Sequence, residues 1–160
     1  MYPTVRKWLE KKELKTANQK EVLRGWVDTL GERLGKKFHV DRFDEMIYQM
    51  VHRAASAAFA GEKPRMAYFV FEPLPNGDPA KTKSILLQLT SLWNLLGKPT
   101  NFPFYLVKIK TKRLDAFDLV KDFKKGREET SEAVCAALQG KAPLFSFKKG
   151  EICKVGEATT

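Results

Sequence analysis

Residues 66–72 read MAYFVFE, residues 78–96 read DPAKTKSILLQLTSLWNLL, and residues 104–111 read FYLVKIKT. The first and third stretches are short and rich in aromatic or β-branched residues, which predicts two strands, the first of them buried on both faces. The second stretch opens with Asp78 before a proline and is followed by Gly97, as is typical of the two ends of a helix. This order predicts a right-handed βαβ unit with parallel strands.

The N-terminal side of this unit is expected to be helical. Residues 5–9 place apolar side chains at helical spacing, which indicates a short first helix. A second helix is predicted to start at a cap on Asn18 and to end at Gly35. A third helix, with a continuous apolar stripe, is predicted to run from a cap on Asp41 to Gly61.

The C-terminal side is expected to combine helices and strands. Two short helical patterns precede Gly140, and Cys135 in the second of them is expected to be a small core residue. Strand patterns on both sides of Gly150 predict a β-hairpin. We therefore predict one α/β (or α+β) domain over residues 1–160, with a mainly helical part at 1–61, the βαβ unit at 66–111, and helices and the hairpin at 114–155.

The composition is that of an ordinary globular domain with an excess of positive charge. The chain has 29 Lys and Arg against 19 Asp and Glu, a net charge of +10, and 43% hydrophobic residues. These values exclude a disordered tail, a collagen-like fibre and a disulfide framework. No stretch resembles a signal peptide or has the ~20 apolar residues of a membrane span, so Cys135 and Cys153 are expected to be free thiols. We expect a cytoplasmic protein that binds no membrane and needs no cofactor or metal.

Lysines alternate with apolar or small residues in the second predicted strand. Lys108, Lys110 and Lys112 would lie on one face of it, ~6.6–6.8 Å apart, which is comparable to the spacing of phosphates along a nucleic acid strand. Residues 81–160 also hold 15 Lys and Arg against 8 Asp and Glu. This pattern predicts contacts with phosphates. The candidate nucleic-acid-binding residues are Lys108, Lys110, Lys112, Arg113, Lys121, Lys124, Lys125, Arg127, Lys148 and Lys149.

The alternating lysines and the nearby phenylalanines each have a second interpretation. Alternating lysines also occur on edge strands, where they prevent pairing between molecules. Phe102, Phe104 and Phe145 can in principle stack on bases, but such residues are more typical of a core. Because no base-reading motif is present, we expect recognition of the backbone and its shape rather than of sequence.

Residues 77–82 read GDPAKT, between the first predicted strand and the long helix, where phosphate-binding loops occur. A loop of that kind needs glycine immediately before the lysine, and Ala80 occupies this position, while Pro79 removes a backbone donor. These two departures from the phosphate-binding motif argue against nucleotide hydrolysis. Lys81 and Lys83, near the start of the helix, can still contact a phosphate of a larger ligand.

Carboxylates in the N-terminal half give an alternative, enzymatic hypothesis. Asp28 and Glu32, with Lys36 nearby, are residue types that bind Mg²⁺ and activate water for phosphodiester cleavage. His39, Asp41, Asp44 and Glu45 follow closely in the sequence. The simpler interpretation is that Arg24, Asp28 and Glu32 form a ladder of ion pairs and that Asp41 is a helix cap.

The segment Gly25 to Asp28, with Tyr2, Pro3 and Gln49, is similar to restriction-endonuclease-like domains. That resemblance implies a metal-dependent nuclease, active or degenerate. The chain departs from the pattern because no Asp/Glu-x-Lys strand lies between Asp28 and Phe43.

Other catalytic chemistry finds little support. His39 and His52, without neighbouring cysteines, make a poor transition-metal site, and no Ser or Cys has an adjacent base. The leading hypothesis is therefore a non-enzymatic protein that binds the backbone of DNA or RNA, alone or as a subunit of a larger nucleoprotein complex. The alternatives are the nuclease and a protein–protein adaptor with a solvating basic face.

Overall fold

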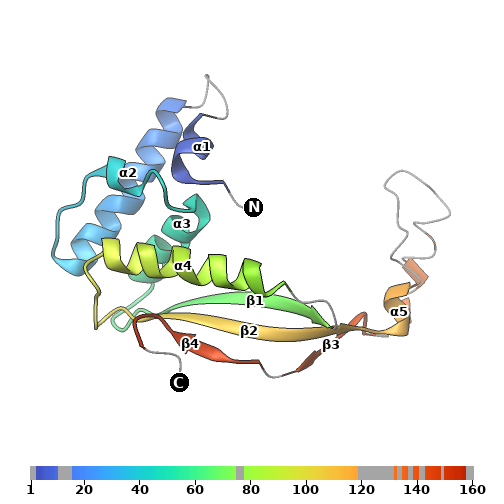
Figure 1. Cartoon of the computed structure of the whole chain (residues 1–160). Helices are drawn as coiled ribbons and strands as arrows, with labels where there is room; N and C mark the ends of the chain where they lie inside the picture. The colour runs from blue at the N-terminus through green and yellow to red at the C-terminus, as the bar shows by residue number, and fades with distance from the viewer. Residues whose placement is uncertain are drawn as a thin grey trace. The chain divides into compact units, whose positions relative to one another are not determined.

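A computed structural model shows a mixed α/β fold whose four-stranded sheet follows a helical N-terminal region (Figure 1). The structure describes residues 3–10, 16–74, 78–118, 132, 135–136, 139–140, 143–148 and 150–157. The elements are α1 (Val5–Leu9), α2 (Thr16–Leu34), the 3-10 helix η1 (Val40–Phe43), α3 (Tyr48–Phe59), β1 (Met66–Leu74), α4 (Pro79–Leu95), β2 (Phe104–Arg113), α5 (Asp115–Asp118), β3 (Phe145–Lys148) and β4 (Ile152–Lys154).

The chain divides into two compact units. Unit 1 comprises Met1–Tyr68, Ala80–Leu106 and Ile152–Thr160, and unit 2 comprises Phe69–Pro79 and Val107–Glu151.

The βαβ unit is present, with α4 connecting β1 to β2 (Figure 1). Met66 N donates a hydrogen bond to Pro103 O over 3.1 Å, and the Thr111 hydroxyl donates to Glu72 O over 3.3 Å. These contacts advance in the same direction along both strands, so the strands are parallel, as predicted. The helix ends just before Gly97, whose φ of 81° is the left-handed conformation of a helix C-terminus.

Strand β1 is half-buried, and the prediction that both its faces are covered is wrong. Met66, Tyr68 and Val70 are buried, whereas Phe69 and Phe71 are exposed. This is the period of two of a strand with one covered face. An unbroken apolar run does not indicate how many faces of a strand are buried, because the same run is compatible with one buried face or two.

The predicted C-terminal hairpin is also wrong, because β3 and β4 both pair with β2 and not with each other. β4 is antiparallel to β2, as shown by hydrogen bonds from Lys108 N to Glu151 O (2.8 Å) and from Val155 N to Phe104 O (2.9 Å). Gly150 lies so close to the Lys108 carbonyl oxygen that a Cβ there would overlap it. The glycine therefore permits a close approach to β2 rather than a reversal of the chain.

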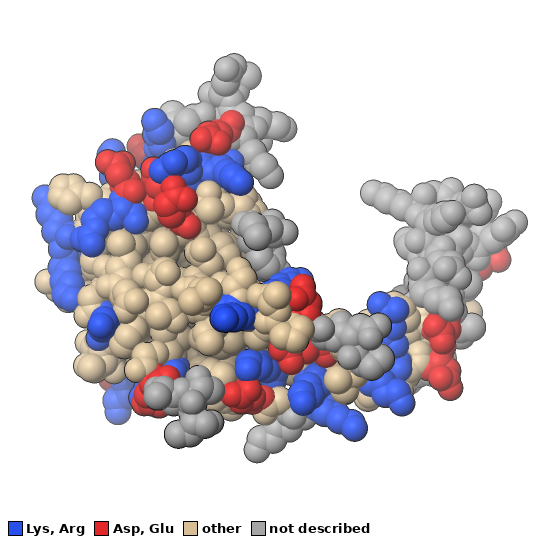
Figure 2. All heavy atoms as spheres, viewed as in Figure 1, with Lys and Arg blue, Asp and Glu red and all other residues tan. Residues whose placement is uncertain are grey.

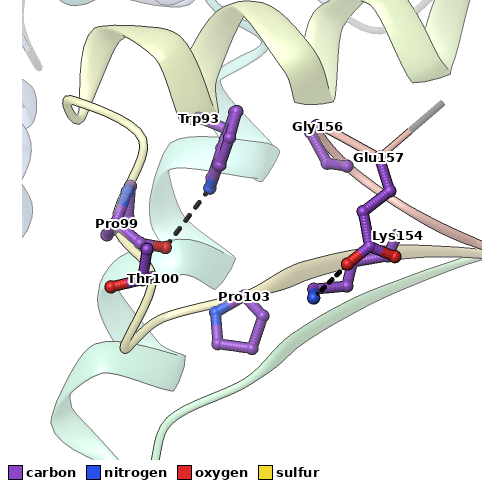
Figure 3. A pocket seen from close by; sticks show the side chains of 8 residues that line it. Trp93, Pro99, Thr100, Pro103, Lys154, Gly156 and Glu157 are labelled. Atoms are coloured by element: carbon purple, nitrogen blue, oxygen red, sulfur yellow. Dashed lines mark hydrogen bonds and ion pairs between the residues drawn. The ribbon is translucent and has the colours of Figure 1, made fainter.

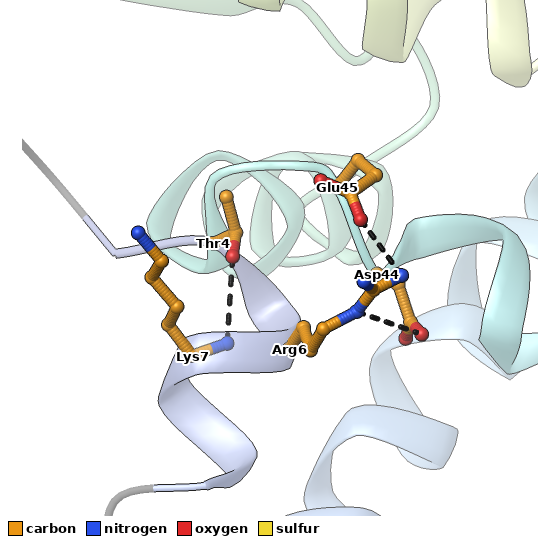
Figure 4. Close-up of polar contacts among 5 residues, drawn as sticks. All are labelled: Thr4, Arg6, Lys7, Asp44 and Glu45. Carbon is orange, nitrogen blue, oxygen red and sulfur yellow. Dashed lines mark hydrogen bonds and ion pairs between the residues drawn. The ribbon is translucent and has the colours of Figure 1, made fainter.

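Helix α1 is held by the segment before α3. The Thr4 hydroxyl caps it by accepting a hydrogen bond from Lys7 N (3.4 Å) (Figure 4). Val5 N donates to Met46 O (2.8 Å). Thr4 also forms an isolated β-bridge with Ile47.

This bridge explains why the predicted cap on Asp41 is wrong. Asp41 lies in the short helix η1, and α3 begins only at Tyr48. Because the backbone just before Tyr48 is paired with the start of α1, it cannot be helical at the same time. Asn18, the other predicted cap, lies inside α2, which begins at Thr16 and ends before Gly35 as predicted.

Four aromatic rings join α1, α2 and α3 in unit 1. Trp8 stacks on Tyr48 and on Trp26, with ring centroids 5.2 and 5.5 Å apart, and Trp26 stacks on His52 at 4.6 Å. Stacked pairs of this kind contribute ~0.5–1.5 kcal/mol beyond the area that they bury. His52 is exposed and makes this ring contact with Trp26.

The C-terminal helices are described only in part. The structure describes α5 and a few helical residues after it, and the rest of the two predicted helices lies outside the described residues. Cys135 is exposed, so its prediction as a core residue is wrong, whereas Cys153 is buried; neither of the two is in a disulfide, as predicted. Cysteine and alanine are among the residues most often buried, so their sequence pattern favours a core and gives no sign of the exposed position.

Candidate nucleic-acid interface

The pairing of β2 with β3 places lysines opposite one another in unit 2. In the antiparallel register Lys110 is the partner of Lys148, and Lys112 is the partner of Ser146. Directly opposite residues in such a pair have Cβ atoms ~4.5–5.5 Å apart. Because side chains alternate along a strand, Lys110, Lys112 and Lys148 share one face of the two strands. We call these three residues the lysine face.

The lysine face has no carboxylate partner in the part of the chain that the structure describes. All three residues are exposed, and none of them forms an ion pair with a described residue. Like charges directly opposite each other destabilise a sheet. The repulsion between Lys110 and Lys148 is therefore uncompensated by the described residues.

Lys108, the first member of the predicted row, differs from the other two. Its Nζ lies 2.7 Å from Glu151 Oε2, and its side chain retains only 23% exposure. The ion pair neutralises the charge that sequence reasoning assigned to phosphate binding. Glu151 is 43 residues away in the sequence, so no local pattern could have indicated the pair.

Arg113 lies on the opposite face from Lys112, since the two are neighbours in one strand. Its guanidinium group lies over the ring of Phe117, 4.6 Å from the centroid, and that ring packs against Phe145 at 5.1 Å. Arg113 thus does not continue the row of lysines, although it keeps an exposed positive charge. The remaining candidates, Lys121, Lys124, Lys125, Arg127 and Lys149, lie outside the described residues.

Three phenylalanines on the sheet of unit 2 are more than half exposed, and sequence reasoning missed them. Phe69, Phe71 and Phe147 retain 53%, 57% and 64% of their surface, and the rings of Phe71 and Phe147 meet edge-on at 6.2 Å. Phe147 is paired with Thr111, so it lies on the face opposite to Lys110 and Lys112. We call these three residues the phenylalanine face.

The three phenylalanines that the sequence analysis weighed for base stacking are less exposed than those of the phenylalanine face. Phe102 and Phe104 are fully buried in the core of unit 1, as expected, whereas Phe145 is 37% exposed. The alternation within MAYFVFE was the only available signal for Phe69 and Phe71, and it is hidden because every second residue is also apolar.

Positive charge is spread over the surface and is partly used by the fold. Figure 2 shows Lys and Arg at several separate places on the side in view, with Asp and Glu beside many of them. In unit 1, Arg33 donates to Gly61 O (2.6 Å) and to Glu62 O, just beyond α3. Lys36 donates to Leu96 O (3.4 Å) at the C-terminus of α4. Cations are favourable at both places because helix carbonyls carry partial negative charge there.

The candidate nuclease residues come together but do not form a metal site. Asp28, Glu32 and Lys36 line one depression of about 430 Å³ on unit 1. The carboxylates are exposed, and Lys36 is bound to the Leu96 carbonyl. Among the described residues no three His, Cys, Asp or Glu side chains are placed to hold a metal ion.

Two of the other acidic residues, Asp44 and Glu45, form ion pairs with helix α1. Arg6 Nη2 lies 2.7 Å from Glu45 Oε1, and Arg6 Nε lies 3.7 Å from Asp44 Oδ2 (Figure 4). The expected ladder is not formed, because no ion pair joins Arg24 to Asp28 or Glu32, all of which are described.

A smaller pocket of about 220 Å³ lies on unit 1 between Trp93 of α4 and the end of β4 (Figure 3). Trp93 Nε1 donates to Pro99 O (3.4 Å), and Lys154 pairs with Glu157. The hydrogen bond from Lys154 to Glu157 raises the pKa of the lysine above its ordinary value. The volume is below the ~300–1,000 Å³ of typical small-molecule sites, and its cation is already neutralised.

Comparison with known proteins extends only to the first part of the chain. The model of a family described as Domain of unknown function (DUF6946) matches residues 1–100, which include α1 to α4. No curated protein and no solved structure matches the chain. In the described part of the chain, no helix is long and apolar enough to cross a bilayer.

Proposed function

The chain belongs to this family of unknown function, DUF6946, and we propose that it binds the phosphate backbone of nucleic acid without catalysing a reaction on it. The observation that carries the proposal is the placement of Lys110 opposite Lys148, with Lys112 on the same face. A cytoplasmic location, and work as a free protein or as a subunit of a nucleoprotein complex, belong to the same proposal.

Electrostatics explain why this arrangement suits a polyanion. Two ammonium groups on directly paired residues repel each other in the free protein, and a bound phosphate between them relieves that repulsion. Successive lysines on β2 are ~6.6–6.8 Å apart, so neighbouring phosphates of one strand can be contacted together. Each contact releases condensed counterions from the nucleic acid, which gives the interaction its salt dependence.

The proposal specifies the backbone rather than a sequence. Lysine presents a compact charge without the planar, two-pronged donor geometry with which arginine reads guanine. The lysine face consists of lysines alone, and therefore we expect similar affinity for different sequences of the same length and strandedness.

The test compares two triple variants with the same change in net charge. Lys110→Gln/Lys112→Gln/Lys148→Gln removes the lysine face, whereas Lys7→Gln/Lys63→Gln/Lys98→Gln removes three exposed lysines of unit 1. Binding to single- and double-stranded DNA and RNA is measured across a salt series. We expect the first variant to bind at least tenfold more weakly at low salt, with a salt slope reduced by about two to three, and the second to bind nearly as the wild type does.

Two outcomes would contradict the proposal. Equal losses in both triple variants would show that only the total charge matters, and absence of binding at low salt would remove the function altogether. Inclusion of Mg²⁺ and examination of the recovered nucleic acid also test the alternative hypothesis. Cleavage that is lost in Asp28→Asn would make the protein a nuclease and move the site to unit 1.

A further inference from the structure

From the exposed sheet of unit 2 we infer that the nucleic acid is single-stranded and that its unpaired bases stack on the phenylalanine face. The inference rests on the proposed function and adds the class of nucleic acid. It is carried by Phe69, Phe71 and Phe147, none of which contributes to the lysine face.

The exposure of these three phenylalanines indicates a binding surface. Each of the three residues is more than half exposed, although β1, which carries Phe69 and Phe71, buries Tyr68 and Val70 on its other side. Single exposed apolar residues are normal on a protein surface, whereas a contiguous group marks a binding site. The rings of Phe71 and Phe147 touch edge-on although β2 lies between their strands, so these three residues include a contiguous pair.

The spacing of the rings suits bases that are spread along a strand. Phe69 and Phe71 are two residues apart in β1, which places them ~6.6–6.8 Å apart on one face. The Phe71 and Phe147 centroids are 6.2 Å apart. Aromatic side chains stack on any base, because every base has a flat π-face, so this contact tolerates all sequences. It thus complements a backbone contact that is itself independent of sequence.

Charge selects a nucleic acid strand over an apolar segment of protein as the occupant. Lys148 follows Phe147 directly on β3, so their side chains lie on opposite faces of a strand at the edge of the sheet, and Arg113 lies on the same face as Phe147. A single strand that crosses the sheet edge at β3 can place phosphates beside Lys148 on one face and bases over Phe147 on the other. A duplex can satisfy the lysines but not the rings, because its bases are stacked within the helix.

The experiment uses three probes of equal length: a single strand, its duplex, and a single strand made of abasic nucleotides. Phe71→Leu/Phe147→Leu keeps apolar side chains but removes the rings, and Phe59→Leu is the matched control, since Phe59 is 85% exposed on α3 of unit 1. Phe71→Tyr/Phe147→Tyr changes the same two positions but keeps aromatic rings, so it distinguishes a loss of stacking from a loss caused by altered folding.

We expect the wild type to prefer the single strand over the other two probes. The double leucine variant should lose about tenfold in affinity for the single strand, with little change for the duplex and the abasic strand. The tyrosine variant should bind the single strand as the wild type does, and Phe59→Leu should have no effect.

The outcomes separate the two proposals. If the lysine variants lose binding but the leucine variant binds every probe as the wild type does, the stacking inference is wrong and the proposed function stands. If no probe binds at low salt, both are wrong. If the leucine variant changes the oligomeric state without changing affinity for the single strand, the phenylalanine face is an interface between copies of the chain, which also overturns the inference.

Discussion

The cations of the two units are placed in different ways. In unit 1, Arg6 pairs with carboxylates, and Arg33 and Lys36 bind carbonyl groups at helix ends. In unit 2, Lys110 and Lys148 face each other and have no ion pair with any described residue. Unit 1 nevertheless has the larger excess of charge, with 18 Lys and Arg against 10 Asp and Glu, compared with 11 against 9 in unit 2. Net charge therefore does not locate a candidate anion site. The feature that distinguishes unit 2 is the placement of two cations directly opposite each other without an ion pair to any described residue.

The largest effect is expected from a change that breaks the edge of the sheet beside the lysine face. In Gly150→Ala the new Cβ would overlap the Lys108 carbonyl oxygen, so β3 and β4 cannot both stay paired with β2. We expect a loss of about 3 kcal/mol in the free energy of unfolding, measured by urea denaturation, together with weaker binding of nucleic acid.

Gly25→Ala is the control for that change. Nothing lies within 4 Å of the position of its Cβ, and Gly25 is inside α2. Alanine there should stabilise the protein by up to about 1 kcal/mol because it is the better helix former. A Gly150→Ala protein as stable as the wild type would show that the close approach to Lys108 is not needed.

A moderate effect is expected where unit 1 uses a cation within the fold. In Arg33→Ala the carbonyls of Gly61 and Glu62 lose their charged donor. Because these groups are exposed and water can replace part of the contact, we expect a loss of about 1 kcal/mol in the free energy of unfolding. Arg24→Ala, on the same helix and without an ion pair in the described part of the chain, should change stability by less than about 0.5 kcal/mol. Equal effects of the two changes would contradict the structural role of Arg33.

The smallest effects are expected at Lys108 and Lys110, where substitution by alanine should change the free energy of unfolding in different directions. Lys110→Ala removes the repulsion with Lys148 and should raise the free energy of unfolding by about 0.5 kcal/mol or leave it unchanged. Lys108→Ala breaks the pair with Glu151 and should lower it by about 0.5 kcal/mol. Thermal unfolding measures both, and only Lys110→Ala should weaken binding. A loss of stability in Lys110→Ala would contradict the unrelieved repulsion.

Part of the candidate site was accessible from local pattern. The period of two in residues 104–111 correctly placed Lys110 and Lys112 on one face, since side-chain alternation follows directly from strand geometry. The pairing of Lys148 with Lys110, and of Lys108 with Glu151, depends on how segments about 40 residues apart align. Register of that kind is set by packing across the sheet, and neighbouring residues do not reveal it.

The sequence by itself determined the helices and strands whose signals are local. Asp78 and Pro79 open α4 and Gly97 ends it, because capping and left-handed backbone conformations depend on a few adjacent residues. Only the tertiary structure decided which apolar face is covered, where β3 and β4 pair, and which cations are neutralised. Each of these depends on contacts between distant segments, and the same apolar or basic residue is compatible with either outcome until those contacts form.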